Sequence, residues 1–74
     1  MVSRDTCLKH LRANMRRIRT EKGITRDMVG MALGVHYTTV FNWERGHTTP
    51  PAADLYLWCK FMDVDMESMF SAMD

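Results

Sequence analysis

The 74-residue sequence is poor in cysteine, proline and glycine, with two, two and four residues of these types. Two cysteines cannot form a disulfide-rich scaffold, and the polar first residues hold no apolar signal core, so we expect a cytoplasmic protein with reduced thiols. Cys7 and His10 share a C-x-x-H spacing, but no second ligand pair follows at a usable interval, which argues against a zinc site. The longest apolar run, residues 28–35, is too short to span a membrane.

The side-chain sets of an enzyme active site are also missing. Ser68 and Ser71 have no histidine and carboxylate at credible positions for activating a nucleophile. The sequence has neither a glycine-rich phosphate-binding loop nor a metalloprotease helix motif. We therefore expect a protein that is not an enzyme and that uses no metal and no cofactor.

The length allows one domain, residues 1–74, and an apolar fraction of 46% is sufficient for a folded core. A core this small gives only marginal stability. A compact helical bundle or an obligate dimer is a way to reach sufficient stability. The net charge of +1 hides an asymmetry. Residues 1–49 carry nine Lys and Arg against four Asp and Glu, whereas residues 50–74 carry one against five. This division is typical of a basic face for an anionic partner, or of an ordinary solvated surface.

Apolar residues in the first third of the chain recur at steps of three and four, which predicts a helix over about residues 5–21. The residues of this stripe are Leu8, Leu11, Met15 and Ile18. Ser3, Asp5 or Thr6 is suited to cap the start of the helix, and Gly23 is suited to end it.

The next two predicted helices are short and close together. Thr25 is a good N-cap for a helix over residues 25–33, and Gly34 is expected to end that helix with a positive φ. A further helix is predicted over residues 37–44, only about three residues later. Two helices joined by such a turn form a helix-turn-helix unit, here over about residues 25–45.

The last third of the chain predicts two more helices. One begins near Pro51 and runs to about residue 62, and a short one follows with Asp65 as its cap. The sequence has no strand-like alternation and no internal repeat. We therefore predict an all-α domain of five short helices.

The sequence from Leu11 to Phe70 resembles the helix-turn-helix regulators of the phage Cro and repressor type, also called the Xre family. The matching residues are Leu11, Ile18, Arg19, Gly23, Ile24, Thr25, Val29, Gly30, Leu33, Gly34, Val35, Val40, Trp43, Glu44, Arg45, Gly46, Pro50, Met62 and Val64. The Glu-Arg-Gly triplet, with Pro50 four residues after its glycine, is the most specific part of the match.

The resemblance implies a compact five-helix, lambda-repressor-like domain that binds double-stranded DNA and regulates transcription, as a repressor. The residues placed to contact base edges are Tyr37, Thr38, Asn42 and Phe41. Those placed to contact the DNA backbone are Thr25, Arg26, Thr39, Arg45, His47 and Thr48. Arg19 and Glu44 correspond to a structural ion pair between helices. A bacterial or phage source is also implied, with association with the nucleoid when the protein is bound.

Three positions depart from the family pattern. His36 stands where a Ser or Thr N-cap is usual, Gly30 replaces the commoner alanine, and Phe41 is bulky for its site. A small residue is expected at Gly30 because the two helices must approach closely.

The helix predicted over residues 51–62 is apolar nearly all round, so it needs burial on more than one side. We expect a homodimer surface within residues 52–74, formed by the exposed apolar side chains of this segment. The candidate residues are Leu57, Phe61, Met66 and Phe70, with Met69 and Met73 in the same segment. The alternative is an ordinary core helix with more apolar residues than the core of one chain can bury, and no dimer.

A second function remains open on the same fold, a protein-interaction or antitoxin-like adaptor module with a protein partner. Met28 and Met31, together with Phe41, favour this alternative if they form one exposed apolar patch.

Overall fold

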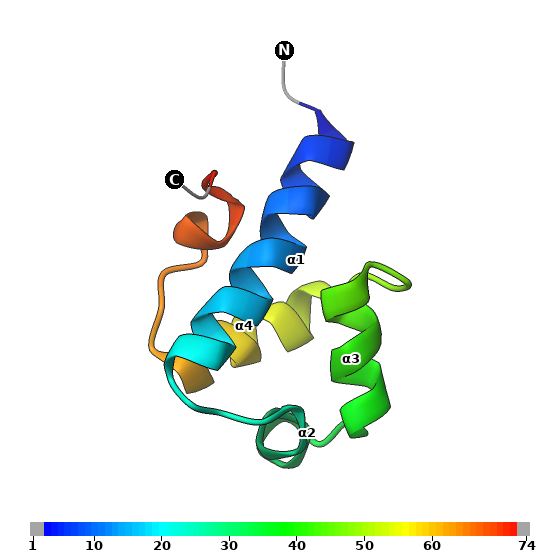
Figure 1. Cartoon of the computed structure of the whole chain (residues 1–74), viewed down its shortest axis with the longest axis vertical. Helices are drawn as coiled ribbons and strands as arrows, with labels where there is room; N and C mark the ends of the chain where they lie inside the picture. The colour runs from blue at the N-terminus through cyan, green and yellow to red at the C-terminus, as the bar shows by residue number, and fades with distance from the viewer. Residues whose placement is uncertain (1–2, 73–74) are drawn as a thin grey trace.

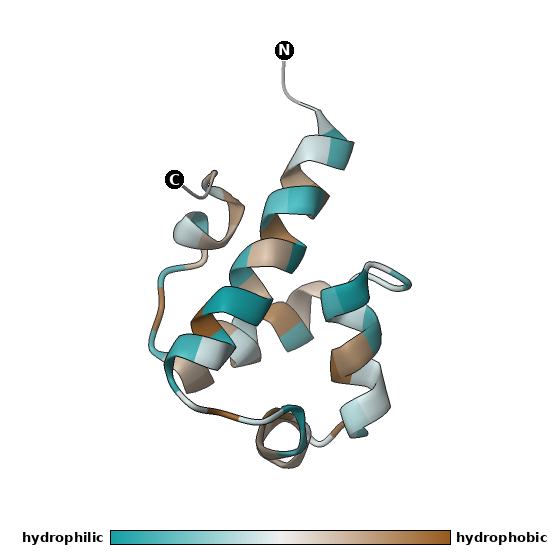
Figure 2. Ribbon diagram, in the orientation of Figure 1, coloured by the Kyte–Doolittle hydropathy of each residue, from teal (hydrophilic) through white to brown (hydrophobic). Residues whose placement is uncertain are grey.

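The computed structural model describes residues 3–72, and its first element is the long helix α1, Arg4–Glu21 (Figure 1). Ser3 caps this helix, because its hydroxyl accepts a hydrogen bond from the Thr6 amide at 3.3 Å. The chain leaves the helix through Gly23, at a positive φ of 69°. The ribbon of α1 alternates hydrophilic and hydrophobic bands (Figure 2), as expected for a helix with one face on the core.

The helix-turn-helix unit consists of α2, Arg26–Leu33, and α3, Tyr37–Arg45 (Figure 1). Thr25 caps α2 through its hydroxyl, and Gly34 ends it at a φ of 75°. His36 caps α3, because its ring Nδ1 accepts a hydrogen bond from a backbone amide of the first turn at 3.2 Å. The unusual residue at this position therefore still satisfies one of the unpaired amides of the helix start.

The last two elements are α4, Ala52–Met62, and a single 3₁₀ turn η1, Glu67–Phe70. Residues 3–72 thus hold four α-helices and no strand, and the expectation of five helices is wrong for the last one. Its amides bond to carbonyls three residues back, the pattern of a tight 3₁₀ turn, which suits so short a segment. The Asp65 side chain does not cap it; instead, the Asp65 carbonyl accepts a hydrogen bond from the Ser68 hydroxyl at 2.6 Å.

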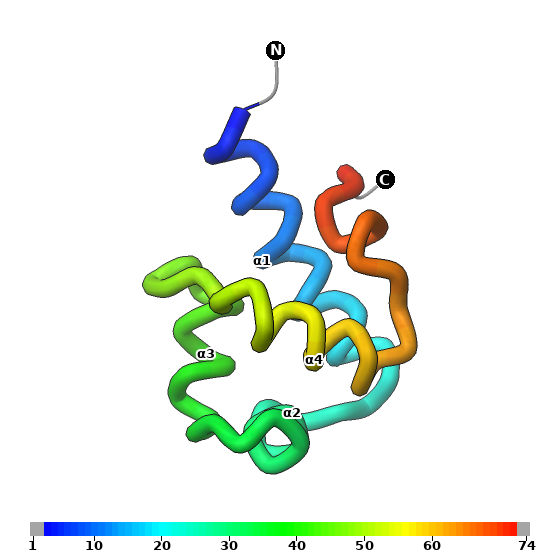
Figure 3. The backbone as a smooth tube through the Cα atoms, turned by 180° about the vertical axis from the view of Figure 1, so that it is seen from behind, coloured from blue at the N-terminus to red at the C-terminus, as the bar shows by residue number. Residues whose placement is uncertain are grey.

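The η1 turn is fastened to α1 by Asn14, which is 1% exposed. Its Nδ2 donates to the carbonyls of Met69 and Ser71, at 2.8 Å each. Arg17 donates to the Asn14 Oδ1 at 3.2 Å, so both ends of the amide are used. Figures 1 and 3 both show η1 beside the N-terminal half of α1. The His10 Nδ1 lies 3.2 Å from the Phe70 carbonyl oxygen, so two side chains of α1 contact the carbonyl groups of the C-terminal turn.

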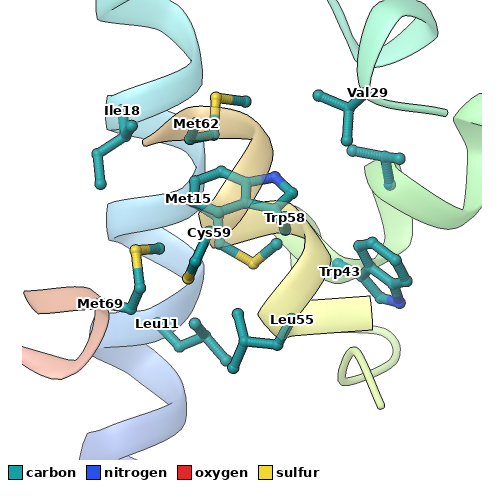
Figure 4. Close-up of a cluster of buried hydrophobic side chains, with 11 residues drawn as sticks. Leu11, Met15, Ile18, Val29, Trp43, Leu55, Trp58, Cys59, Met62 and Met69 are labelled. Atoms are coloured by element: carbon teal, nitrogen blue, oxygen red, sulfur yellow. The ribbon is translucent and has the colours of Figure 1, made fainter. Parts of the chain in front are cut away.

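The core lies between α1, α4 and the helix-turn-helix unit (Figure 4). Its buried residues are Leu11, Met15, Ile18, Val29, Val40, Trp43, Leu55, Trp58, Cys59, Met62 and Met69. Trp58 is fully buried at its centre, and its indole Nε1 has no hydrogen-bond partner among the described residues. The apolar stripes predicted from spacing thus meet in one cluster contributed by every element.

One side of α4 faces solvent with apolar side chains. Leu57 is 47% exposed and Phe61 is 41% exposed, and Met66 after the helix is 38% exposed. Phe70 is only half-buried but packs against the core, and Met73 lies outside the described residues. None of the described helices is both long enough and apolar enough to cross a membrane.

Candidate nucleic-acid interface

The close connection between α2 and α3 requires two glycines, Gly30 within α2 and Gly34 at its end. A Cβ on Gly30 would lie 2.5 Å from the carbonyl oxygen of Val35, which is backbone and has no flexible end to move aside. Gly34 has a positive φ with no atom near its Cβ direction, so there the requirement comes from the backbone conformation alone. The absence of a side chain at Gly30 therefore lets the turn pass close to α2, which places the start of α3.

A buried carboxylate holds α1, α2 and α3 together. The Glu44 side chain is 0% exposed and lies 2.6 Å from the Arg19 Nε and 3.1 Å from the Arg26 Nε. Arg19 also donates from Nη2 to Glu44 and from Nη1 to the Ile24 carbonyl, so its three donor nitrogens are all used. The pair implied by the resemblance is present, and a second arginine shares the same carboxylate. The cluster carries a net charge of +1.

Phe41 brings two cations together beside this cluster. The guanidinium carbon of Arg26, on α2, lies 5.1 Å from the centroid of its ring, and that of Arg45, one turn later on α3, lies 5.5 Å from it. The ring itself is half-buried. Both distances are within the range of a cation–π interaction.

The predicted base-contacting residues follow one another along α3. Tyr37 and Thr38 are exposed in its first turn, and Asn42 is half-buried one turn later. The Thr38 hydroxyl lies 2.9 Å from the His36 Nδ1, and the rings of His36 and Tyr37 have centroids 5.0 Å apart. The first turn of α3 therefore presents an aromatic ring and a threonine methyl to solvent.

Comparison with known protein families shows to which family the chain belongs. The sequence matches the family model described as Helix-turn-helix over residues 15–68, which is more than two-thirds of the chain. The chain belongs to the helix-turn-helix family of Cro and Xre type. This is a family of DNA-binding transcription regulators, and not a family of enzymes. No curated protein matches the sequence.

In this helix-turn-helix protein the predicted backbone-contacting residues lie at the start of α2, within α3, and at the end of α3 with the loop that follows it. Thr25 uses its hydroxyl to cap α2, and Thr39 is half-buried within α3. Arg45, His47 and Thr48 are exposed at the C-terminal end of α3 and in the loop that follows. Arg26 is half-buried at the start of α2, where it is bound to Glu44 and lies against Phe41.

One basic residue of the helix-turn-helix protein was not singled out from the sequence. Arg12, on α1, lies across the Gly46 turn, where a Cβ would be 2.6 Å from its Cδ and 2.8 Å from its Nη1. Its side chain therefore reaches the loop that carries His47 and Thr48. No local pattern could have found this contact, because the two residues are far apart in the sequence.

Proposed function

We propose that this chain is a sequence-specific transcriptional repressor that binds double-stranded DNA with α3 in the major groove. The observation that carries the proposal is the arrangement of α3, whose first turn is exposed and whose last turn is held by the buried Glu44 cluster, with Arg26 and Arg45 beside that end. The start of a helix held in this way can enter the major groove, where each base pair shows a distinct donor and acceptor pattern.

Each base-contacting candidate has a chemistry that fits this role. The Asn42 amide is suited to a bidentate contact with adenine N6 and N7. Thr38 has its hydroxyl against His36, which leaves its methyl group for a thymine methyl. The Tyr37 hydroxyl is suited to a base edge or a phosphate. Phe41 remains a candidate from the resemblance, although its place against two arginines favours a role in positioning them.

Contacts to the sugar-phosphate backbone would fix the protein on the duplex. Arg26 at the start of α2 combines a cation with a helix N-terminus, which is favourable for an anion. The loop after α3 supplies further cationic and hydroxyl groups. The complete set that we propose is Thr25, Arg26, Thr39, Arg45, His47 and Thr48.

A homodimer is the assembly that we propose for this function. The exposed Leu57, Phe61 and Met66 lie on or just after α4, and Phe70 is half-buried in the segment that follows. Two copies joined through this surface would place two α3 helices roughly 34 Å apart, one DNA turn, on a palindromic operator. Repression in the cytoplasm of a bacterium, at the nucleoid, is the role that we infer for this dimer.

A protein-interaction module is the alternative, and one observation favours it. Met31 is 85% exposed and Met28 is 46% exposed, both on α2. Exposed methionines are adaptable contacts for an apolar partner surface. An antitoxin-like adaptor would bind its protein partner through this side.

Selection from a random duplex library, followed by gel-shift titration of the winning duplex at two salt concentrations, tests the proposal. We expect a palindromic winner whose affinity falls steeply with salt, because DNA binding releases counterions. Arg26→Ala should weaken all duplexes alike and reduce the salt slope by about one. A library with no enriched sequence, and no binding at low salt, would move the assignment to the protein-interaction module.

A further inference from the structure

Arg26 and Arg45 come from different helices but meet at one side chain. The two guanidinium groups both lie within 5.5 Å of the centroid of the Phe41 ring. Two like charges repel each other, so gathering them at one place is unfavourable unless something attracts both. The aromatic ring attracts both cations, and the Glu44 carboxylate attracts Arg26 in addition.

The donor groups of Arg26 are not all used inside the protein. Its hydrogen bond to Glu44 runs through Nε, whereas Arg19 uses all three of its nitrogens. Within residues 3–72, Arg45 forms no ion pair, and its guanidinium group lies over the Phe41 ring. Both arginines therefore keep guanidinium N–H groups for an external anion while their side chains are held in place.

We propose that Phe41 is a positioning residue, whose ring presents Arg26 and Arg45 together to the phosphates of bound DNA. This inference rests on the proposed DNA binding. A guanidinium that is already ordered loses less conformational freedom when it binds a phosphate, so the ring increases affinity. Because phosphate contacts carry no sequence information, Phe41 acts on affinity for all duplexes and not on base preference. Its assigned role thus changes from base contact to support of backbone contacts.

The test compares Phe41→Leu, which keeps an apolar side chain but removes the ring, with Phe41→Tyr, which keeps the ring. The first readout is the NMR spectrum of the protein without DNA. We expect the side-chain protons of Arg26 and Arg45 to carry ring-current shifts in the wild type and in Phe41→Tyr, and to lose them in Phe41→Leu. Urea unfolding of each variant shows whether the fold is retained.

The second readout is binding to the selected duplex and to a scrambled duplex. Phe41→Leu should weaken both by the same factor, about fivefold to thirtyfold, and Phe41→Tyr should restore them. In a background with Arg26→Ala and Arg45→Ala, Phe41→Leu should have no further effect. That background separates the loss of arginine positioning from a loss of packing.

The outcomes separate this inference from the proposed function. A loss confined to the selected duplex would show that Phe41 contacts a base, and unchanged binding to both duplexes would show that it positions nothing. Ring-current shifts that are absent from the wild type would overturn the placement of the two arginines. Wild-type protein that binds neither duplex would overturn the proposed function, whatever the NMR spectrum shows.

Discussion

The buried Glu44 carboxylate allows a prediction about two arginines that share one partner. Its side chain is 0% exposed, and those of Arg19 and Arg26 are 11% and 30% exposed. Arg19→Ala removes two of the three hydrogen bonds to the carboxylate but leaves Arg26 in place. Arg26→Ala removes one bond and leaves Arg19. Only the double variant leaves a buried charge with no partner.

The expected costs follow from this geometry. Arg26→Ala should lower the free energy of unfolding by about 1 kcal/mol, the value of one hydrogen bond in a partly exposed pair. Arg19→Ala should lower it by about 3 kcal/mol, the lower end for breaking a buried ion pair. The double variant should exceed the sum of the two by about 1–3 kcal/mol, because each arginine compensates for the loss of the other.

Urea unfolding followed by the fluorescence of Trp43 and Trp58 measures these costs, since both indoles are buried and report on the core. Glu21→Gln is the matched control, because it breaks the exposed pair with Arg17 and should change stability by less than about 0.5 kcal/mol. Additive effects of the two arginine substitutions would refute the reasoning. So would an Arg19→Ala variant no less stable than Glu21→Gln.

Three further predictions concern single residues. Gly30→Ala should lower the free energy of unfolding, measured in urea titrations, by about 1–3 kcal/mol, because the new Cβ meets the Val35 carbonyl oxygen. Helix propensity alone predicts the opposite, a gain of about 1 kcal/mol in this free energy. Asn14→Ala should lower it by about 1–3 kcal/mol and speed amide exchange in η1, because two carbonyls there lose their donor. Burial raises the pKa of the Cys59 thiol, and the Asp65 carboxylate raises it further, so the thiolate is disfavoured in the folded state. The contribution of Cys59 to the free energy of unfolding is therefore complete below the ordinary thiol pKa and is lost as the pH rises above it. Unfolding experiments at alkaline pH should show the free energy of unfolding falling more steeply with pH for the wild type than for Cys59→Ala.

Each of these three single-residue predictions has a result that would contradict it. A more stable Gly30→Ala variant would mean that the turn backbone moves aside at no cost. Unchanged exchange in η1 for Asn14→Ala would mean that packing and the His10 contact to the Phe70 carbonyl hold the turn without Asn14. Parallel alkaline profiles for the wild type and Cys59→Ala would assign the decline to other groups.

The elements that the sequence predicted well are those marked by local signals. The bounds of α2 and α3 agree with the structure to within one residue, because caps and left-handed glycines act within a few residues of the helix ends. Thr25 and Gly34 are such signals. The last helix was predicted wrongly because Met66, Met69 and Phe70 have helical spacing. So short a pattern does not distinguish an α-helix from a 3₁₀ turn, and in the structure Met69 is buried whereas Met66 is exposed.

The contacts that the sequence did not reveal join residues far apart along the chain. Asn14 reaches the C-terminal turn, Arg12 reaches Gly46, and Arg26 shares the carboxylate of Glu44. Periodicity and capping patterns describe each helix against its own neighbours in sequence, so they do not tell which helix ends meet in space. The role of Phe41 belongs to the same class, since one of its two arginines lies on another helix.

The central claim is that α3 reads DNA sequence, and the affinity of Asn42→Ala for the selected and the scrambled duplex tests it most directly. We predict that this variant loses about 1–3 kcal/mol of binding free energy on the selected duplex and keeps its affinity for the scrambled one, with relaxed preference at one base pair. An equal loss on both duplexes, or no loss on either, would contradict the assignment of α3 as the element that reads the sequence.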